Sequence, residues 1–89
     1  MASVESVTAY PNPFNEKLNI EFTLAEDSRV QLEIFNLGGQ RIAQLFEGNA
    51  KAGELQKFEF NPETAADGMI IYRLQTKHGV IFGKAVFAK

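Results

Sequence analysis

Residues 68–89 read GMIIYRLQTKHGVIFGKAVFAK, and this stretch decides the fold because it holds the two densest apolar runs of the chain. Met69–Leu74 and Val80–Ala88 are rich in β-branched and aromatic residues, so both are expected to be strands. Lys77–Gly79 joins them and has the length of a three-residue hairpin loop, in which Gly79 supplies the left-handed position. We therefore expect a hairpin that ends the fold, and with it the protein.

Alternating apolar residues upstream predict five further strands, against which this hairpin packs. Ser3–Tyr10 alternates weakly and is expected at a sheet edge. Lys17–Leu24 and Arg29–Asn36 alternate strictly, as half-buried antiparallel strands do. Gln40–Glu47 is less regular, which predicts a bulge, and Glu54–Asn61 resumes the alternation. The chain is thus expected to form seven short strands.

The alternation also assigns each strand residue to a face. Ile42, with Leu45 or Phe46, is expected inward in the irregular strand. Glu21, Glu33 and Glu59 fall on outward positions and are expected to lie on the solvated face. The other residues expected to face inward are Leu18, Ile20, Phe22, Val30, Leu32, Ile34, Phe58, Phe60, Tyr72 and Leu74.

Turns at nearly even spacing between these strands favour an antiparallel β-sandwich over a barrel or an α/β unit. Helix signals occur only in residues 61–68, NPETAADG, where Asn61 can cap, Pro62 suits the first turn and Gly68 ends it. That segment has room for about one turn. With 89 residues, the chain is expected to be one domain with a single core.

Tyr10-Pro11-Asn12-Pro13-Phe14 is the most distinctive short motif. Each proline fixes φ, lacks an N–H and pushes the preceding residue towards extended geometry, so the segment is expected to be a stiff connector outside the strand ladder. Phe14 is expected to pack as a plug at one end of the core. A proline-rich ligand for a recognition domain is the weaker interpretation, because one Pro-x-Pro is too short for a convincing polyproline helix.

The composition offers little for catalysis or for a ligand site. His78 is the only histidine, lies in a hairpin loop and is accompanied by no cysteine, so a metal site is not expected. Gly38-Gly39 lacks the strand–loop–helix context of a phosphate site and is expected to be a turn. The absence of tryptophan disfavours glycan binding, and the acidic net charge disfavours nucleic acid. No enzyme activity, cofactor or small-molecule substrate is expected.

The net charge of −2 is unevenly distributed. Residues 1–68 hold all eleven acids and five bases, a balance of −6, whereas residues 69–89 hold four bases and no acid, a balance of +4. Two interpretations remain open: an ordinary solvated face of the hairpin, or a basic contact surface for a partner. The four bases are Arg73, Lys77, Lys84 and Lys89.

From the Tyr10–Phe14 motif onward, the sequence resembles the type A C-terminal sorting domain of the type IX secretion system of Bacteroidetes-type bacteria. The similarity covers nearly the whole chain from about residue 6. Isoleucine at position 70, phenylalanine at 60 and asparagine at 61 stand where the family often has an aromatic residue, tryptophan and aspartate. The further landmarks are Leu18–Phe22, Val30–Asn36, Leu37-Gly38-Gly39-Gln40, Ala52-Gly53, Phe58–Asn61, Gly68–Leu74, Gly83-Lys84 and Lys89.

The resemblance implies an immunoglobulin-like sandwich that is the last domain of a larger secreted precursor, with the cargo on its N-terminal side. Such a domain is a non-catalytic address. It is read by the outer-membrane translocon after the cargo reaches the periplasm, and a sortase-like protease commonly removes it. The cargo is then released or held at the cell surface, in some cases on anionic lipopolysaccharide.

Recognition by the translocon is expected in the basic final hairpin. Lys84 and Lys89 are the leading contacts, Arg73 and Lys77 support them, and Gly83 belongs to the same closing motif. The alternative is a structural immunoglobulin-like module, similar to those of flagellar hook-capping proteins or bacterial surface stalks, with no sorting role. Fold alone does not separate these two functions, because function depends on the sites that a fold displays.

Overall fold

Seven strands make up the described part of the chain, which in this computed structural model comprises residues 4–14, 16–61 and 68–87. These residues contain no helix, and so none that is long and apolar enough to cross a membrane. The one-turn helix expected within residues 62–67 lies outside them. The strands are β1 (Val4–Tyr10), β2 (Leu18–Leu24), β3 (Ser28–Phe35), β4 (Arg41–Ala50), β5 (Gln56–Phe60), β6 (Met69–Thr76) and β7 (Gly79–Val86).

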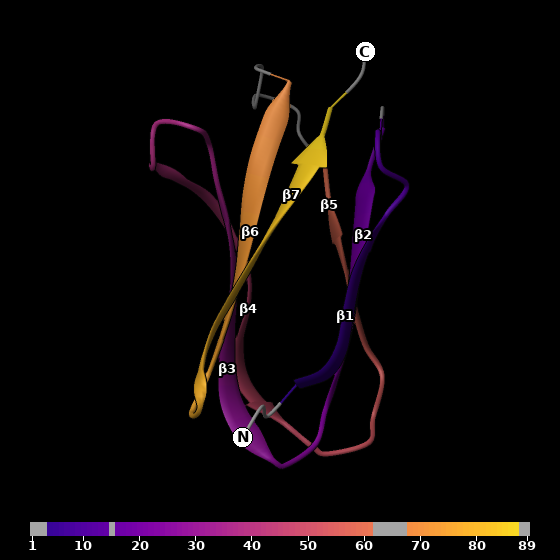
Figure 1. The fold of residues 1–89 in the computed structure, drawn as a ribbon, viewed down its shortest axis with the longest axis vertical. Helices are drawn as coiled ribbons and strands as arrows, with labels where there is room; N and C mark the ends of the chain where they lie inside the picture. Colours follow the sequence, from indigo (N-terminus) through magenta and orange to yellow (C-terminus); the bar gives the residue numbers. More distant parts are fainter. Residues whose placement is uncertain (1–3, 15, 62–67, 88–89) are drawn as a thin grey trace.

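The strands form two antiparallel sheets that face each other (Figure 1). One sheet has the order β1-β2-β5 and the other the order β4-β3-β6-β7, so β1 is an edge strand, as the sequence predicts. Pairing of β2 with β5 and of β3 with β6 joins strands that are not consecutive, as in immunoglobulin-like sandwiches. The predicted all-β sandwich is confirmed.

The core lies between the sheets and is built from the inward positions of the strict alternations. β2 buries every second residue from Leu18 to Leu24. Of the ten strand residues expected to face inward, nine are buried, and Phe58 is half-buried against the core. Alternation identifies them because successive side chains of a strand point to opposite faces of the sheet.

The irregular strand β4 contains two bulges rather than the single one that the sequence predicts. Opposite β3, the register passes from Phe46 to Gln44 and later from Ala43 to Arg41. Leu45 and Ile42 are therefore the extra residues, and each one shifts the alternation by one position. The inward placement of Ile42 is wrong, since its side chain is 37% exposed, whereas Leu45 and Phe46 both pack against the core.

The last hairpin has a two-residue loop, Lys77-His78, rather than the expected three. Thr76 pairs with Gly79, so both residues extend the strands and Gly79 is the first residue of β7. Its φ of 149° is one that residues with a side chain rarely adopt. Gly79 therefore does supply the positive φ that closes the hairpin, but from within the strand.

The Tyr10–Phe14 connector leads from β1 towards β2 in one sheet and contacts β7 at the edge of the other sheet. Phe14 is 1% exposed, and its ring lies 5.4 Å from that of Phe87, between ring centroids. The Phe14 N–H donates to the Val86 carbonyl at 2.8 Å. The peptide bonds before Pro11 and Pro13 are both cis. The connector places Phe14 as the plug that the sequence predicts.

Candidate partner-binding surface

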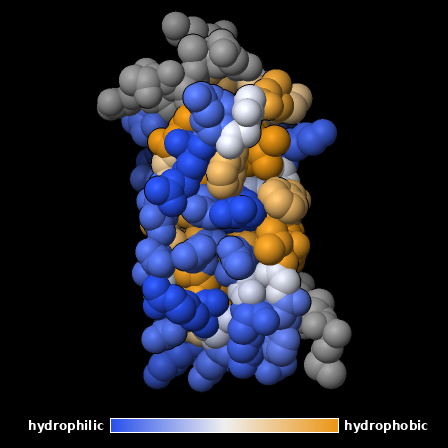
Figure 2. Space-filling model, turned by 90° about the vertical axis from the view of Figure 1, so that its left-hand side faces the viewer, coloured by the Kyte–Doolittle hydropathy of each residue, from blue (hydrophilic) through white to orange (hydrophobic). Residues whose placement is uncertain are grey.

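The outward positions of β7 form one edge of the outer face of the four-stranded sheet. Val80, Phe82, Lys84 and Val86 are exposed there, whereas Ala85 is buried in the core. Figure 2 shows this face, with polar side chains over most of it and apolar ones gathered near one edge in the upper half. Phe82 is 64% exposed, which is unusual for a residue of its size.

Gly83 has a packing role inside the sandwich. It pairs with Tyr72 across the β6–β7 ladder, and a Cβ at position 83 would overlap the Tyr72 ring. Burial raises the pKa of the Tyr72 hydroxyl above its usual value. Position 83 thus needs glycine so that Tyr72 can lie across β7. This requirement does not depend on contact with a partner.

Arg73 forms an ion pair on the outer face instead of presenting a free charge. Its guanidinium contacts the Glu33 carboxylate directly, and Arg41 donates to the same carboxylate at 3.0 Å. The guanidinium carbon also lies 4.8 Å from the centroid of the Phe35 ring, a cation–π distance. Arg73 is therefore held in place by Glu33 and Phe35, which both lie on β3.

Glu33 pairs with both Arg41 and Arg73, and the expectation that its side chain is solvated is wrong. The residue is 4% exposed, although alternation places it on the outer face. β3 is a central strand, so side chains from β4 and β6 cover it from both sides. The hydrogen bond from Arg73, with that from Arg41, holds the pKa of Glu33 below its usual value against the opposing effect of burial.

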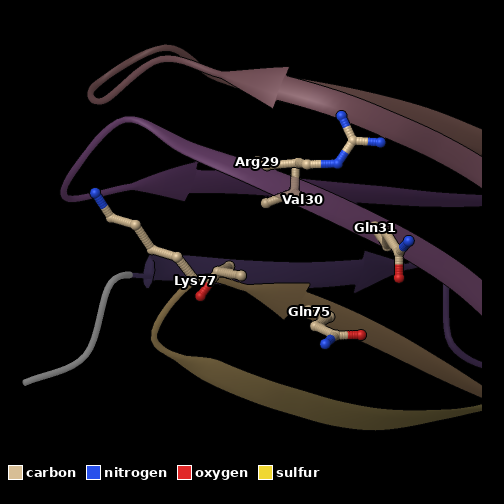
Figure 3. A pocket seen from close by; sticks show the side chains of 6 residues that line it. Arg29, Val30, Gln31, Gln75 and Lys77 are labelled. Atoms are coloured by element: carbon tan, nitrogen blue, oxygen red, sulfur yellow. The ribbon is translucent and has the colours of Figure 1, made fainter.

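Lys77 and His78 form the hairpin loop and both reach the carboxylate of Glu26. The Lys77 Nζ lies 3.6 Å from Glu26 Oε1, and the His78 Nε2 lies 3.4 Å from Glu26 Oε2. A hollow of about 250 Å³ beside the loop is lined in part by Gln31 and Gln75. Lys77 also lines this hollow, and Figure 3 shows its side chain extending towards the turn between β2 and β3, where Glu26 lies.

Lys84 differs from the other two described cations of the hairpin. Its side chain is exposed and has no acid within ion-pair distance in the described part of the chain. The Asn12 side chain donates to the Lys84 carbonyl at 3.4 Å, which fixes the backbone beneath it. Lys89 lies outside the described residues. Arg73 and Lys77 therefore each have an acidic partner, whereas Lys84 has none among the described residues.

An apolar hollow of about 210 Å³ lies on the same outer face. It extends from the β3–β4 turn, where Gly39 has a φ of 87°, to Phe82 on β7. The sequence analysis did not identify this hollow. The alternation of β7 does place Phe82 and Ala85 on opposite faces of the sheet, and this pattern indicates that the Phe82 ring is exposed. The side chains that line the hollow are those of Phe35, Asn36, Leu37, Ile71, Arg73 and Phe82.

Among residues 4–14, 16–61 and 68–87, no group of three histidine, cysteine, aspartate or glutamate side chains could hold a metal ion. The features that stand out are an exposed cation, an exposed aromatic ring and an apolar hollow on one face of a sandwich. These features identify a candidate partner-binding surface on a β-sandwich domain.

A family model described as a secretion system C-terminal sorting domain matches residues 8–88, and the chain belongs to this family. The domain is a C-terminal sorting signal for type IX secretion. It acts with the type IX machinery to direct export across the outer membrane, towards the cell surface or the medium. The family is in general non-catalytic, and no finding supports the alternative of a structural stalk module.

No match was found among curated proteins or among solved structures. The assignment to type IX secretion therefore depends on the family match.

Proposed function

We propose that the outer-membrane translocon of the type IX system reads this domain in its folded form, after the cargo has reached the periplasm. The chain is one sorting domain at the C-terminal end of a larger precursor, with the cargo on its N-terminal side. A sortase-like protease then removes it, and the cargo is released or stays at the cell surface. The core supports recognition of a folded domain, because Phe14 and the strand alternations form one continuous cluster.

The contact surface in this proposal is the basic final hairpin, and the exposed charge of Lys84 is the observation that supports it. Residues 69–87 contain three bases and no acid. Glu33 compensates Arg73 and Glu26 lies near Lys77, so Lys84 is the cation with its charge open to a partner. Lys89 is its proposed companion. Arg73, Lys77 and Gly83 shape and support the surface.

Charge complementarity acts mainly on the rate and selectivity of encounter, so an acidic receptor surface would gain most from this arrangement. Exposed lysines contribute little to folding, about 1 kcal/mol or less. Reversing their charge therefore separates recognition from stability, which truncation of β7 does not.

The test compares two double variants of the domain fused to a passive periplasmic cargo in a host with the type IX machinery. Lys84→Glu with Lys89→Glu reverses the hairpin charges. Lys51→Glu with Lys57→Glu makes the same change in net charge at exposed positions outside the hairpin. We expect export to fall for the first variant and to remain for the second, with both unfolding midpoints nearly unchanged.

Equal export of the two folded double variants would contradict recognition through the hairpin charges. The asymmetry of +4 and −6 would then be an ordinary solvated face.

A further inference from the structure

The hydrogen bonds of the Asn12 side chain reveal how the backbone of β7 is oriented. Asn12 donates to the Lys84 carbonyl at 3.4 Å, and its own oxygen accepts from the Val86 N–H at 2.9 Å. Both groups therefore point away from β6. In an antiparallel strand the N–H and C=O groups of alternate residues face the same side. Val80 and Phe82 consequently also direct their backbone groups to the outer edge of the sheet.

The Tyr10–Phe14 connector supplies hydrogen-bond partners only to the second half of the outer edge of β7. Asn12 and Phe14 together satisfy the Lys84 carbonyl and both backbone groups of Val86. The N–H and C=O groups of Val80 and Phe82 have no partner among the described residues, and β7 pairs there with β6 alone. In Figure 1 the end of β7 leans towards the β1-β2-β5 sheet, whereas its beginning stands away from it.

An open edge of this kind is a template for another strand unless bulges, prolines or charges obstruct it. The opposite edge of the same sheet, β4, has two bulges. From Val80 to Lys84, β7 has a regular register with β6 and no proline. Val80 is 44% and Phe82 is 64% exposed on the outer face, so a strand added here would have apolar side chains beside it.

We propose that Val80–Lys84 takes up an extended segment of a protein of the type IX machinery by β-strand addition. The segment continues the four-stranded sheet and places apolar side chains beside Val80 and Phe82. It offers a carboxylate to Lys84. Backbone hydrogen bonds give affinity in such an arrangement, and the alternate side chains give specificity. This deepens the proposed function and rests on it for the identity of the partner.

Charge and length favour this occupant over a second copy of the domain. Residues 69–87 contain no acid, so β7 of a second copy brings no carboxylate to Lys84. The connector also limits pairing to about the five residues from Val80 to Lys84. A machinery protein gains further contacts in the adjacent apolar hollow, which is lined by Phe35 and Phe82.

The first test uses backbone amide hydrogen exchange in the isolated domain. The amides of Ile81 and Gly83, which face β6, are expected to exchange slowly. Those of Val80 and Phe82 are expected to exchange at least about tenfold faster, because local opening is not needed where no internal bond exists. Slow exchange of the Phe82 amide would show that the edge is already closed, and would overturn the proposal.

The second test removes the unpaired backbone N–H of Val80 without removing a hydrogen bond between β7 and β6. Val80→Pro deletes an N–H that faces the open edge, a position at which edge strands tolerate proline. Val80→Thr keeps that N–H on a β-branched residue. In the cargo fusion we expect Val80→Thr to be exported at least about tenfold more than Val80→Pro, a ratio equivalent to about 1.4 kcal/mol of binding.

Two controls make the export result decisive. Leu55→Pro places a proline at an exposed position of the loop before β5 and should leave export unchanged. The unfolding midpoint of each variant shows that it is folded. If folded Val80→Pro is exported as well as Val80→Thr, strand addition is overturned, while the charge-reversal test of Lys84 and Lys89 still decides the proposed function.

A photoreactive benzophenone amino acid at position 82 identifies the occupant in the exporting cell. Crosslinking to a protein of the type IX machinery is the expected result. Crosslinking only to a second copy of the domain would overturn the proposed occupant.

Discussion

Truncating Phe14 to alanine tests how much the connector contributes to the fold. The Phe14 side chain is 1% exposed and contacts the Phe87 ring, and its backbone N–H ties it to β7. Phe14→Ala leaves the backbone bond in place and deletes only the ring. The variant therefore measures the packing of the plug and not the hydrogen bonding of the connector.

Removal of a fully buried phenylalanine costs about 3–5 kcal/mol of unfolding free energy, including the cavity that it leaves. A domain of 89 residues has a total of about 4–13 kcal/mol, at about 0.05–0.15 kcal/mol per residue. With a urea dependence of about 1.5 kcal/mol per M, the unfolding midpoint should fall by about 2–3 M. The loss is a large share of the total, so the variant should be strongly destabilised.

Phe82→Ala is the matched control, because it makes the same chemical deletion at a position that is 64% exposed. Its unfolding free energy should change by less than about 1 kcal/mol. Urea unfolding followed by circular dichroism compares the two variants directly. Equal midpoints for Phe14→Ala and Phe82→Ala would refute the assignment of Phe14 as a core plug.

Three further variants test particular contacts. Glu33→Gln should be less stable than the parent protein at pH 7, because the folded-state pKa of Glu33 is lowered from 4.5. Thermal melts should show this difference in stability shrinking as the pH falls below 4.5, and a difference that does not depend on pH would contradict the ion pair. Gly83→Ala should lose about 1–3 kcal/mol through overlap with Tyr72, and an unchanged midpoint in urea would show that the ring does not lie over position 83. Asn12→Ala should lose about 1–2 kcal/mol with its two hydrogen bonds to β7, and faster amide exchange at Val86 should accompany the loss.

Strict alternation made the core predictable from sequence, as β2 illustrates. Every second residue from Leu18 to Leu24 is apolar and every one of them is buried. The same rule failed at Ile42, because a bulge shifts the alternation by one residue and the pattern does not mark where the shift occurs. It failed in another way at Glu33, whose face was correct but whose burial depends on arginines from two other strands.

The candidate surface was predictable only in its charges. Lys84 and its neighbours follow from the composition of the last hairpin. The compensation of Arg73 by Glu33 joins residues 40 positions apart and requires the β3–β6 register. The half-open edge of β7 likewise depends on Asn12 reaching across from a distant segment. Sequence patterns describe each strand, whereas these features arise from which strands become neighbours.

Export of a passive cargo fused ahead of this domain tests the central claim most directly. The fusion is expressed in a host with the type IX machinery and in the same host without a functional translocon, and the cargo is measured in the periplasm and outside the outer membrane. A sorting signal predicts cargo at the surface or in the medium of the first host and in the periplasm of the second. Periplasmic retention of the folded fusion in both hosts would contradict the assignment.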